Sequence, residues 1–333
     1  MKLPGHLLRA ISRLAVVTGF GGCGLGSPTT TVLPVSDQGR LIHHLFMSIA
    51  LWTLFIFVAV EALLLFAVWR SRDRPGRGEP RAVHGHLGLE LGWTLVPALI
   101  VALIAVPTIT AVFKTQAAPP AEALKVEVIG HQWWWEIRYP HAGVTTANEL
   151  HLPVGRPVSL ILKSGDVIHS FWVPRLGGKR DLIPGRVNLL SFTVDEPGEY
   201  RGQCAEFCGL SHANMRLLVL AQSPHEFGRW LQGLAAPPAL PAGNAARGLQ
   251  TFLAGGCVAC HTIRGVSQGV VGPDLTHIGS RKTLAAGLLP NRPEPLARWL
   301  ANPQEVKPGA LMPRLPLTSE QISELVAYLG SLR

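Results

Sequence analysis

The stretch Cys204–Met215 contains two cysteines, a histidine and a methionine at short spacing. Thiolate and thioether sulfur together with imidazole nitrogen is a ligand set that suits copper. A mononuclear electron-transfer copper takes one cysteine, two histidines and a weak methionine, so Cys204 and Cys208 supply one thiolate too many. Two thiolates could instead bridge two copper ions, each of which would need a histidine of its own. His212 supplies one of these, and Met215 adds a weak ligand.

The second histidine must come from elsewhere in the fold, and His169 in Asp166-Val-Ile-His-Ser-Phe-Trp-Val-Pro174 is the best candidate. Two other interpretations of the cysteine pair compete with copper. A disulfide suits an oxidising compartment, but it would close a very short loop, stabilise little and leave His212 and Met215 without a role. Zinc with two thiolates and two histidines is possible, but zinc carries no electron.

A haem-attachment motif lies downstream in Cys257-Val-Ala-Cys-His261. In Cys-x-x-Cys-His the two thiols add to the haem vinyl groups and the histidine becomes an axial ligand. A zinc site would want a further ligand pair, and His277 is the only close residue that could contribute. The Pro273 carbonyl, in Val271-Gly-Pro-Asp-Leu275, could orient the His261 ring from behind. A haem in the same chain also favours copper over redox-inert zinc in the upstream loop.

Met312 is predicted to be the sixth ligand of this haem. Met/His ligation raises the potential of an electron-transfer haem, and the chain has four methionines. Met1 is lost, Met47 lies in an apolar segment and Met215 is assigned to copper. Prolines flank Met312 in Lys307-Pro-Gly-Ala-Leu-Met-Pro313 and stiffen the loop.

The composition indicates a membrane part. Of the 333 residues, 47% are hydrophobic and 15% are charged. The formal charge of +9 could indicate nucleic acid, but no dense Lys/Arg run with interleaved aromatics is present, so we predict no nucleic-acid partner. The apolar segments 41–69 and 87–113 are each long enough to cross a bilayer.

Arginines cluster between these two segments, and such loops stay in the cytoplasm. The two spans therefore form a hairpin, and the chain after Phe113 is predicted on the periplasmic or outer side of a bacterial inner (cytoplasmic) membrane. Carboxylates within spans usually face a bundle interior or a proton path. Glu61 could also be paired against a partner helix, and Glu90 could be an interfacial residue. The arginines are Arg70, Arg72, Arg74, Arg77 and Arg81.

Residues 1–22 have the outline of a secretory signal peptide, with basic residues, the short apolar run 14–20 and two glycines. The run is too short to span a bilayer, which needs about 20 residues. Cys23 directly after the glycines predicts lipoprotein-type cleavage and a diacylated N-terminal cysteine. The alternative is an uncleaved segment with an incidental cysteine.

The middle of the chain predicts an all-β sandwich or barrel. Short segments with alternating apolar and polar residues, at 124–129, 157–163 and 187–194, are separated by turn residues. A sandwich can bring the strand-end His169 close to a distant cysteine loop. Pro/Ala linkers at 114–120 and 234–243 flank this region.

The C-terminal part is predicted to be an all-α haem domain. It opens with a helix at 244–253, and a capping box in Thr318-Ser-Glu-Gln321 starts an amphipathic helix that packs on it. The predicted parts are a signal peptide (1–22), an N-terminal segment with the transmembrane hairpin (23–114), a copper-binding β domain (121–232) and a class I cytochrome c domain (244–333).

Three consecutive tryptophans in His131-Gln-Trp-Trp-Trp-Glu136 are predicted to close the first strand. Successive side chains of a strand point to opposite faces, so all three cannot lie in one core. At least one is expected near the surface or an interface, where an aromatic beside a metal could accept electrons from a partner.

With these motifs, the chain after Cys23 resembles subunit II of the haem–copper cytochrome c oxidases that carry a fused cytochrome c domain, the caa3 type. The resemblance covers nearly all of that part of the chain. It rests on Gly130-His-Gln-Trp-Trp-Trp135, Asp166-Val-Ile-His-Ser-Phe171, Leu182-Ile-Pro-Gly-Arg-Val-Asn188, Gln203-Cys-Ala-Glu-Phe-Cys-Gly-Leu-Ser-His212 and Cys257-Val-Ala-Cys-His261.

The resemblance implies a cupredoxin-type Greek-key sandwich with a binuclear CuA centre. Met215 and the backbone carbonyl of Glu206 are implied as weaker copper ligands, and the Glu206 side chain as a ligand of magnesium at the boundary with subunit I. Trp133 matches the residue at which electrons enter, and Glu90 matches the glutamate at the mouth of a proton pathway into subunit I. The implied main copper ligands are His169, Cys204, Cys208 and His212.

These expectations describe the electron-input subunit of an aa3-type terminal oxidase. Electrons would pass from haem c to CuA and on to haem a in subunit I, where a haem a3–CuB centre reduces O2 to water with proton pumping. Subunit III, membrane lipid and an upstream cytochrome or bc1-type donor are the other expected partners. A copper-handling protein that works alone is the rival interpretation, and a quinol oxidase subunit is rejected because it would lack the cysteines.

Overall fold

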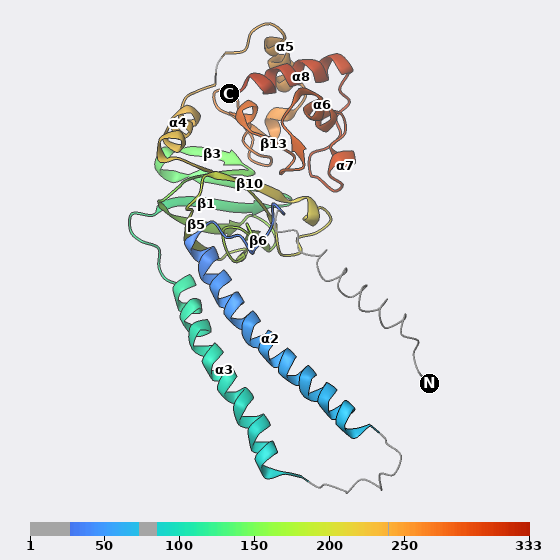
Figure 1. The fold of residues 1–333 in the computed structure, drawn as a ribbon. Helices are drawn as coiled ribbons and strands as arrows, with labels where there is room; N and C mark the ends of the chain where they lie inside the picture. Colours follow the sequence, from blue (N-terminus) through green and yellow to red (C-terminus); the bar gives the residue numbers. More distant parts are fainter. Residues whose placement is uncertain (1–26, 73–84, 239) are drawn as a thin grey trace. The chain divides into compact units, whose positions relative to one another are not determined.

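The computed structural model describes residues 27–72, 85–238 and 240–333 (Figure 1). The chain divides into two compact units, one formed by Arg40–Ala118 and the other by Met1–Gly39 with Pro119–Arg333. Each unit is described by itself. The predicted signal peptide, Cys23 and the arginines at 74, 77 and 81 lie outside the described residues.

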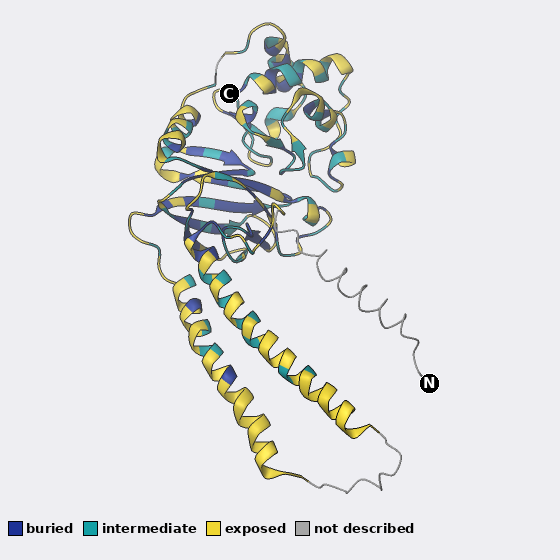
Figure 2. Cartoon of the chain, viewed as in Figure 1, coloured by how far each residue is buried: buried dark blue, intermediate teal, exposed yellow. Residues whose placement is uncertain are grey.

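Two long apolar helices make up the first unit. They are α2 (Asp37–Ser71) and α3 (Leu87–Thr115), and both are long and apolar enough to cross a membrane. Figure 2 shows that most residues of the two helices are exposed, and these include most of their large hydrophobic residues. A surface of that kind requires lipid or a protein partner to cover it. Both helices extend slightly beyond the segments predicted from the sequence.

The carboxylate of Glu90 has a local structural role at the start of α3. It accepts a hydrogen bond from the His86 amide at 3.2 Å, while the His86 ring accepts one from the Leu89 amide at 3.3 Å. The bond to Glu90 gives the His86 amide a partner at the helix start, and the Leu89 amide also donates to the His86 carbonyl at 2.9 Å.

A β-sandwich forms the centre of the second unit. One sheet has the order β3-β2-β1-β5-β8 and the other the order β4-β10-β9-β6-β7, with β1/β5 and β4/β10 parallel and the other pairs antiparallel. The strands are β1 (Leu124–His131), β2 (Trp134–Tyr139), β3 (Val144–Ala147), β4 (Glu149–Pro153), β5 (Pro157–Ser164), β6 (His169–Trp172), β7 (Arg180–Leu182), β8 (Asn188–Thr193), β9 (Gly198–Cys204) and β10 (Arg216–Gln222).

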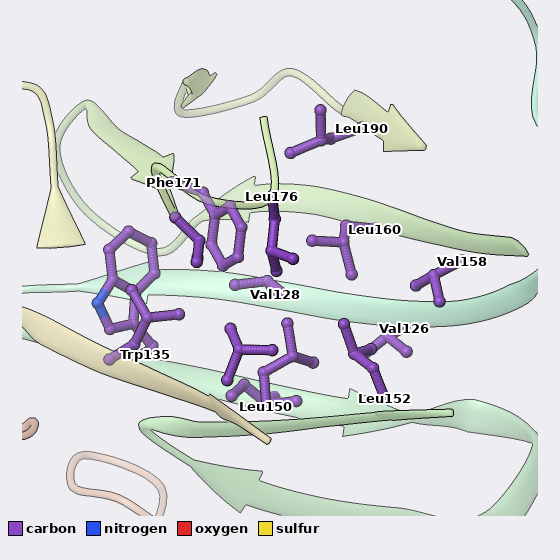
Figure 3. Close-up of a cluster of buried hydrophobic side chains, with 14 of the residues drawn as sticks. Val126, Val128, Trp135, Leu150, Leu152, Val158, Leu160, Phe171, Leu176 and Leu190 are labelled. Atoms are coloured by element: carbon purple, nitrogen blue, oxygen red, sulfur yellow. The ribbon is translucent and has the colours of Figure 1, made fainter. Parts of the chain in front are cut away.

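Apolar side chains from the inner faces of both sheets fill the space between them (Figure 3). Trp135 packs edge-on against Phe171, with ring centroids 5.9 Å apart. Both rings are fully buried, so β2, which contains Trp135, and β6, which begins with His169, are fixed against each other. The sandwich therefore provides a rigid support for the residues at its edge.

Strand β4 departs from the alternation expected of a sheet with one solvated face, because all five of its residues are buried. Leu150 and Leu152 enter the core, whereas Glu149 and His151 are covered from the other side. The His151 ring stacks on Trp230 of α4 (Pro224–Ala235) with ring centroids 3.8 Å apart. Glu149 is covered by the C-terminal domain.

The C-terminal domain is helical, with two short hairpins. Helices α5 (Asn244–Ala254) and α8 (Ser319–Ser331) pack closely, because a Cβ atom on Gly248 would lie 2.0 Å from the Glu324 carbonyl oxygen. The predicted capping box of Thr318 and Gln321 is present. The other elements are α6 (Pro293–Ala301), α7 (Pro303–Val306), β11 (Thr262–Ile263), β12 (Ser267–Gln268), β13 (Thr283–Leu284) and β14 (Leu289–Pro290).

Candidate metal and haem sites

The predicted copper loop connects two neighbouring strands. Cys204 ends β9, and the chain returns into β10 directly after Met215. A hydrogen bond of 2.9 Å from the Cys204 amide to the Met215 carbonyl closes the loop at its base. The first residue of β6 is His169, which brings this histidine beside the loop as the sequence predicts.

The sulfur and imidazole atoms of this loop converge on one small region. The Sγ atoms of Cys204 and Cys208 lie 3.8 Å apart, too far for a disulfide bond of about 2.05 Å. Because thiolate–metal bonds of about 2.3 Å are usual for zinc, both sulfurs can reach the same ion. The ligand atoms of His169, Cys204 and Cys208 all lie within 4.8 Å of one another.

Each thiol has its own imidazole. The Nδ1 atom of His169 lies 3.9 Å from the Sγ of Cys204, and the Nδ1 atom of His212 lies 3.5 Å from the Sγ of Cys208. The thioether sulfur of Met215 lies 3.9 Å from the Sγ of Cys208. The Glu206 carbonyl oxygen lies 3.2 Å from the Sγ of Cys204, which adds a hard donor to the soft ones.

Of the two thiols, that of Cys204 loses its proton readily, whereas that of Cys208 does not. The Cys208 thiol beside it lowers the pKa of Cys204 to about 4, against the effect of burial. The ionised Cys204 in turn raises the pKa of Cys208, and burial acts in the same direction. A second negative charge at this place therefore requires a cation, which is what a bound metal supplies.

Asp166 orients His169, a role that the sequence interpretation did not assign. The Asp166 carboxylate accepts a hydrogen bond from the Nε2 of His169 at 2.7 Å, so the Nδ1 lone pair points toward the thiols. Burial disfavours the charged imidazole, but the bonds to Asp166 and Cys204 outweigh it and raise the pKa of His169. The Asp-x-x-His spacing is the sequence signal from which this role could have been predicted.

Close packing also fixes this histidine. A Cβ atom on Gly130 would lie 2.7 Å from the Cδ2 atom of the His169 ring, so only glycine leaves room for the ring beside β1. Gly130 precedes the tryptophan run, and the motif that contains it thus has a packing role at the site.

The prediction that the tryptophan run closes the first strand is wrong. The run instead spans the turn of a hairpin. Strand β1 ends at His131, and β2 starts at Trp134. The Asp166 carboxylate accepts the Gln132 amide at 2.6 Å, which holds the chain in the turn. Trp133 therefore lies in the turn, where it is 8% exposed and donates a hydrogen bond of 2.9 Å from its indole to the Cys208 carbonyl.

The side chain of Glu206 faces outward. It is 45% exposed, and its carboxylate lies 3.7 Å from the Nζ of Lys179. The Glu206 carbonyl therefore faces the thiol pair, whereas the Glu206 carboxylate faces the protein surface.

A cavity in the C-terminal domain brings the haem-motif residues together. Its walls include Cys257, Cys260, His261 and Met312, and apolar side chains such as Phe252 complete them. Both cysteines are free of disulfide bonds. Two free thiols, an imidazole and a thioether around an apolar cavity fit a covalently bound haem.

The His261 ring is held as predicted. Its Nδ1 atom lies 2.8 Å from the Pro273 carbonyl and donates to it, because a carbonyl can only accept. Burial lowers the pKa of His261, so the ring stays neutral with its Nε2 lone pair free for iron.

Comparisons with known proteins match all three parts of the chain. Residues 31–111 match the family model "Cytochrome C oxidase subunit II, transmembrane domain", residues 141–222 the model "Cytochrome C oxidase subunit II, periplasmic domain" and residues 245–333 the model "Cytochrome c". "Cytochrome c oxidase subunit 2" of Alkalihalophilus pseudofirmus is 37% identical over 322 residues, which is 94% of this chain and 93% of that protein.

Two further relatives mark the breadth of the similarity. "Cytochrome c oxidase subunit 2" of Bacillus sp. (strain PS3) is 33% identical and covers 80% of each chain. "Quinol oxidase subunit 2" of Bacillus spizizenii is 32% identical, over 68% of this chain and 71% of that protein.

Sulfur and imidazole donors beside a haem cavity define a protein that moves electrons. The chain belongs to the cytochrome c oxidase subunit II family and carries a cytochrome c domain at its C-terminal end. It is a membrane-bound subunit of a haem–copper terminal oxidase, with an electron-input role and its copper and haem c domains on the outer side.

Proposed function

We propose that this chain passes electrons from its own haem c to a binuclear CuA centre and then to haem a in subunit I of an aa3-type oxidase. The convergence of two thiols and two imidazoles on one small region carries the proposal. The ligands are His169, Cys204, Cys208 and His212, supplemented by Met215 and the Glu206 carbonyl. The copper pair, when bound, accepts and releases one electron.

The chain's own residues keep that exchange fast. Asp166 and Gly130 hold His169 in place, and the loop closure at Met215 holds the sulfur ligands, so little needs to move when the charge changes. Trp133 extends from the Cys208 carbonyl to the haem cavity, which it helps to line. It therefore offers the route from the haem held by Cys257, Cys260, His261 and Met312.

The same proposal includes three further assignments, to Glu206, Glu90 and Cys23. The exposed Glu206 carboxylate would hold magnesium at the contact with subunit I, where O2 is reduced and protons are pumped. Glu90 would stand at a proton entrance, in addition to its hydrogen bond at the start of α3. Cys23, outside the described residues, would carry lipid after removal of residues 1–22, in a bacterial cytoplasmic membrane with subunit III as a further partner.

The haem domain suggests which donor it serves. Residues 244–333 carry nine Lys and Arg against five Asp and Glu, and of the nine basic residues only Lys307 is buried. A basic surface repels a basic soluble cytochrome c, and salt screens that repulsion. An acidic or membrane-associated donor, such as a bc1-type complex, is therefore favoured. Turnover with a basic cytochrome c should rise with salt; a fall would contradict this assignment.

Co-purification tests the function. The protein is solubilised in mild detergent and followed by absorbance through gel filtration. Haem a should accompany the c-type band. Elution of the chain with copper and haem c but without haem a would favour a copper-handling protein that works alone, and would overturn the oxidase proposal.

A further inference from the structure

The sandwich and the haem domain, which belong to the same compact unit, meet through polar contacts, some of which are buried. The Ser211 hydroxyl, beside the copper ligand His212, donates to the Pro308 carbonyl at 2.6 Å. The Arg216 amide donates to the Ala286 carbonyl at 3.2 Å. These contacts lie between segments that are distant in sequence, and the function proposed above uses none of them.

Glu149 forms the first strong contact. Its carboxylate accepts the amides of Lys282 and Thr283 at 2.8 and 2.7 Å and the Thr283 hydroxyl at 2.8 Å. The residue is 2% exposed, although it stands on the face of β4 that points away from the sandwich core. A carboxylate buried by another domain is tolerated only when its oxygens are hydrogen-bonded, as these are.

Lys307 forms the second strong contact, and here the side chain comes from the haem domain and not from the sandwich. It belongs to the haem domain and is 4% exposed. Its Nζ donates to the Trp133 carbonyl in the sandwich and, at 3.3 Å, to the Ala285 carbonyl in its own domain. The Lys307 side chain thus holds the turn that carries Trp133 against the haem cavity.

An exposed ion pair at the same boundary provides a comparison. Lys282 also contacts Glu199 through its side chain, but both side chains are 52% exposed. An exposed pair of this kind contributes little to binding, whereas leaving buried hydrogen-bonding groups without their partner is far more costly. Glu199 and Glu149 contact the same segment, but removal of Glu149 is expected to weaken the docking of the haem domain much more than removal of Glu199.

We propose that Glu149 and Lys307 form an intramolecular docking clamp that holds the haem domain permanently against the copper loop. The clamp fixes Trp133 between the haem cavity and the Cys208 carbonyl. The haem domain therefore works as a fixed relay and not as a tethered carrier that swings between donor and copper. The docking does not depend on the function of the metals, but its effect on electron transfer rests on the proposed function.

Cleavage of the linker tests the clamp without reference to activity. A specific protease site is inserted between Leu240 and Pro241, where Leu240 is 94% exposed, and the purified complex is cut and passed through gel filtration. The haem fragment of the otherwise unchanged protein should stay with the membrane fragment. Glu149→Ala or Lys307→Met should each raise the dissociation constant of the cut fragment by at least about thirtyfold, and the double variant should release it.

Glu199→Gln is the matched control and should change the dissociation constant by less than about fivefold, because its ion pair is exposed. Release of the fragment from the unsubstituted protein, or its retention in the double variant with intact haem absorbance, would overturn the clamp. Because mass detects the fragment, this result is independent of whether copper is bound.

Amide hydrogen exchange on the uncut, unsubstituted protein provides a test that no variant can confound. The amides of Lys282 and Thr283 should exchange as slowly as those of α5 and α8. Exchange at the rate of an open loop would show that the Glu149 contact is not maintained. In the double variant, haem-to-copper electron transfer should slow at least tenfold (about 1.4 kcal/mol in activation free energy) while the copper and haem spectra stay unchanged.

Discussion

The indole Nε1 of Trp133 lies 2.9 Å from the main-chain oxygen of Cys208 and donates a hydrogen bond to it. The same side chain lines the haem cavity, so one residue contacts both redox sites. Trp133→Phe keeps an aromatic ring but leaves the Cys208 carbonyl without this donor. We expect slower reduction of copper by haem c and a loss of about 1–3 kcal/mol in stability.

Stopped-flow reduction of the variant checks this prediction, with the haem c and copper bands recorded separately. Haem c should still be reduced at the normal rate, while its reoxidation by copper slows. Trp134→Phe is the control, because Trp134 also lines the haem cavity but stacks on His131, whereas the Trp133 indole donates to the Cys208 carbonyl. Equal rates in both variants would remove Trp133 from the route.

Met312 is predicted to control the haem potential. Met312→Ala removes the only predicted sixth ligand in the cavity, and Met/His ligation is what raises the potential of such a haem. The potential should fall by something on the order of 0.1 V, within the roughly 0.8 V range that axial ligands control. Added imidazole should bind the vacated position. A redox titration with an unchanged potential, and no imidazole binding, would show that another group is the ligand.

Asp166 is predicted to set copper affinity without touching copper. Removing a carboxylate that orients a histidine ligand typically costs about 10–100-fold in metal affinity. Asp166→Ala should therefore weaken copper binding by that factor, while Glu122→Gln, an exposed change on the same domain, should leave it unaltered. Competition with a copper chelator measures both. If Asp166→Ala acted only by destabilising the fold, the association of the haem domain would weaken as much as copper binding does. The prediction excludes that result.

His151 is predicted to make the sandwich sensitive to acid. Burial against Trp230 lowers the pKa of this histidine from 6.5 to about 4. Between these two pH values the unfolded chain binds a proton at His151 that the folded chain does not. The contribution of His151 to the free energy of unfolding is therefore fully present above pH 6.5 and is lost as the pH drops toward 4. The loss amounts to about 3 kcal/mol at most.

Denaturant unfolding of the purified protein at pH 7 and pH 4.5 measures this effect, with tryptophan fluorescence as the signal. His151→Gln, which keeps a neutral hydrogen-bonding side chain, should lose that part of the pH dependence. The same acid sensitivity in the variant would assign it to other groups.

The sequence was sufficient to predict which candidate ligand residues the structure brings together. Cys204, Cys208, His212 and Met215 fall in one loop, and the haem motif is contiguous, so type and spacing reveal them. His169 followed from the need for a second imidazole. The alternation of apolar residues likewise predicted the sandwich, and the two apolar segments predicted the long helices.

The parts that escaped prediction depend on contacts between segments distant in sequence. Asp166 becomes an orienting residue only because a turn brings its carboxylate under both His169 and Gln132. Glu149 looks like a solvated position on an alternating strand, and Lys307 looks like a surface lysine, until the second domain buries them. Domain packing of this kind has no local pattern in the sequence.

The EPR spectrum of the purified oxidised complex, together with its copper content, tests the central claim most directly. An unpaired electron shared by two equivalent copper nuclei gives a seven-line pattern, and two thiolates that bridge two coppers predict it for this chain, in addition to the signals of subunit I. Cys208→Ser should abolish the pattern and leave the haem c spectrum intact. A four-line signal from a single copper in the unsubstituted protein, or zinc in place of copper, would contradict the account.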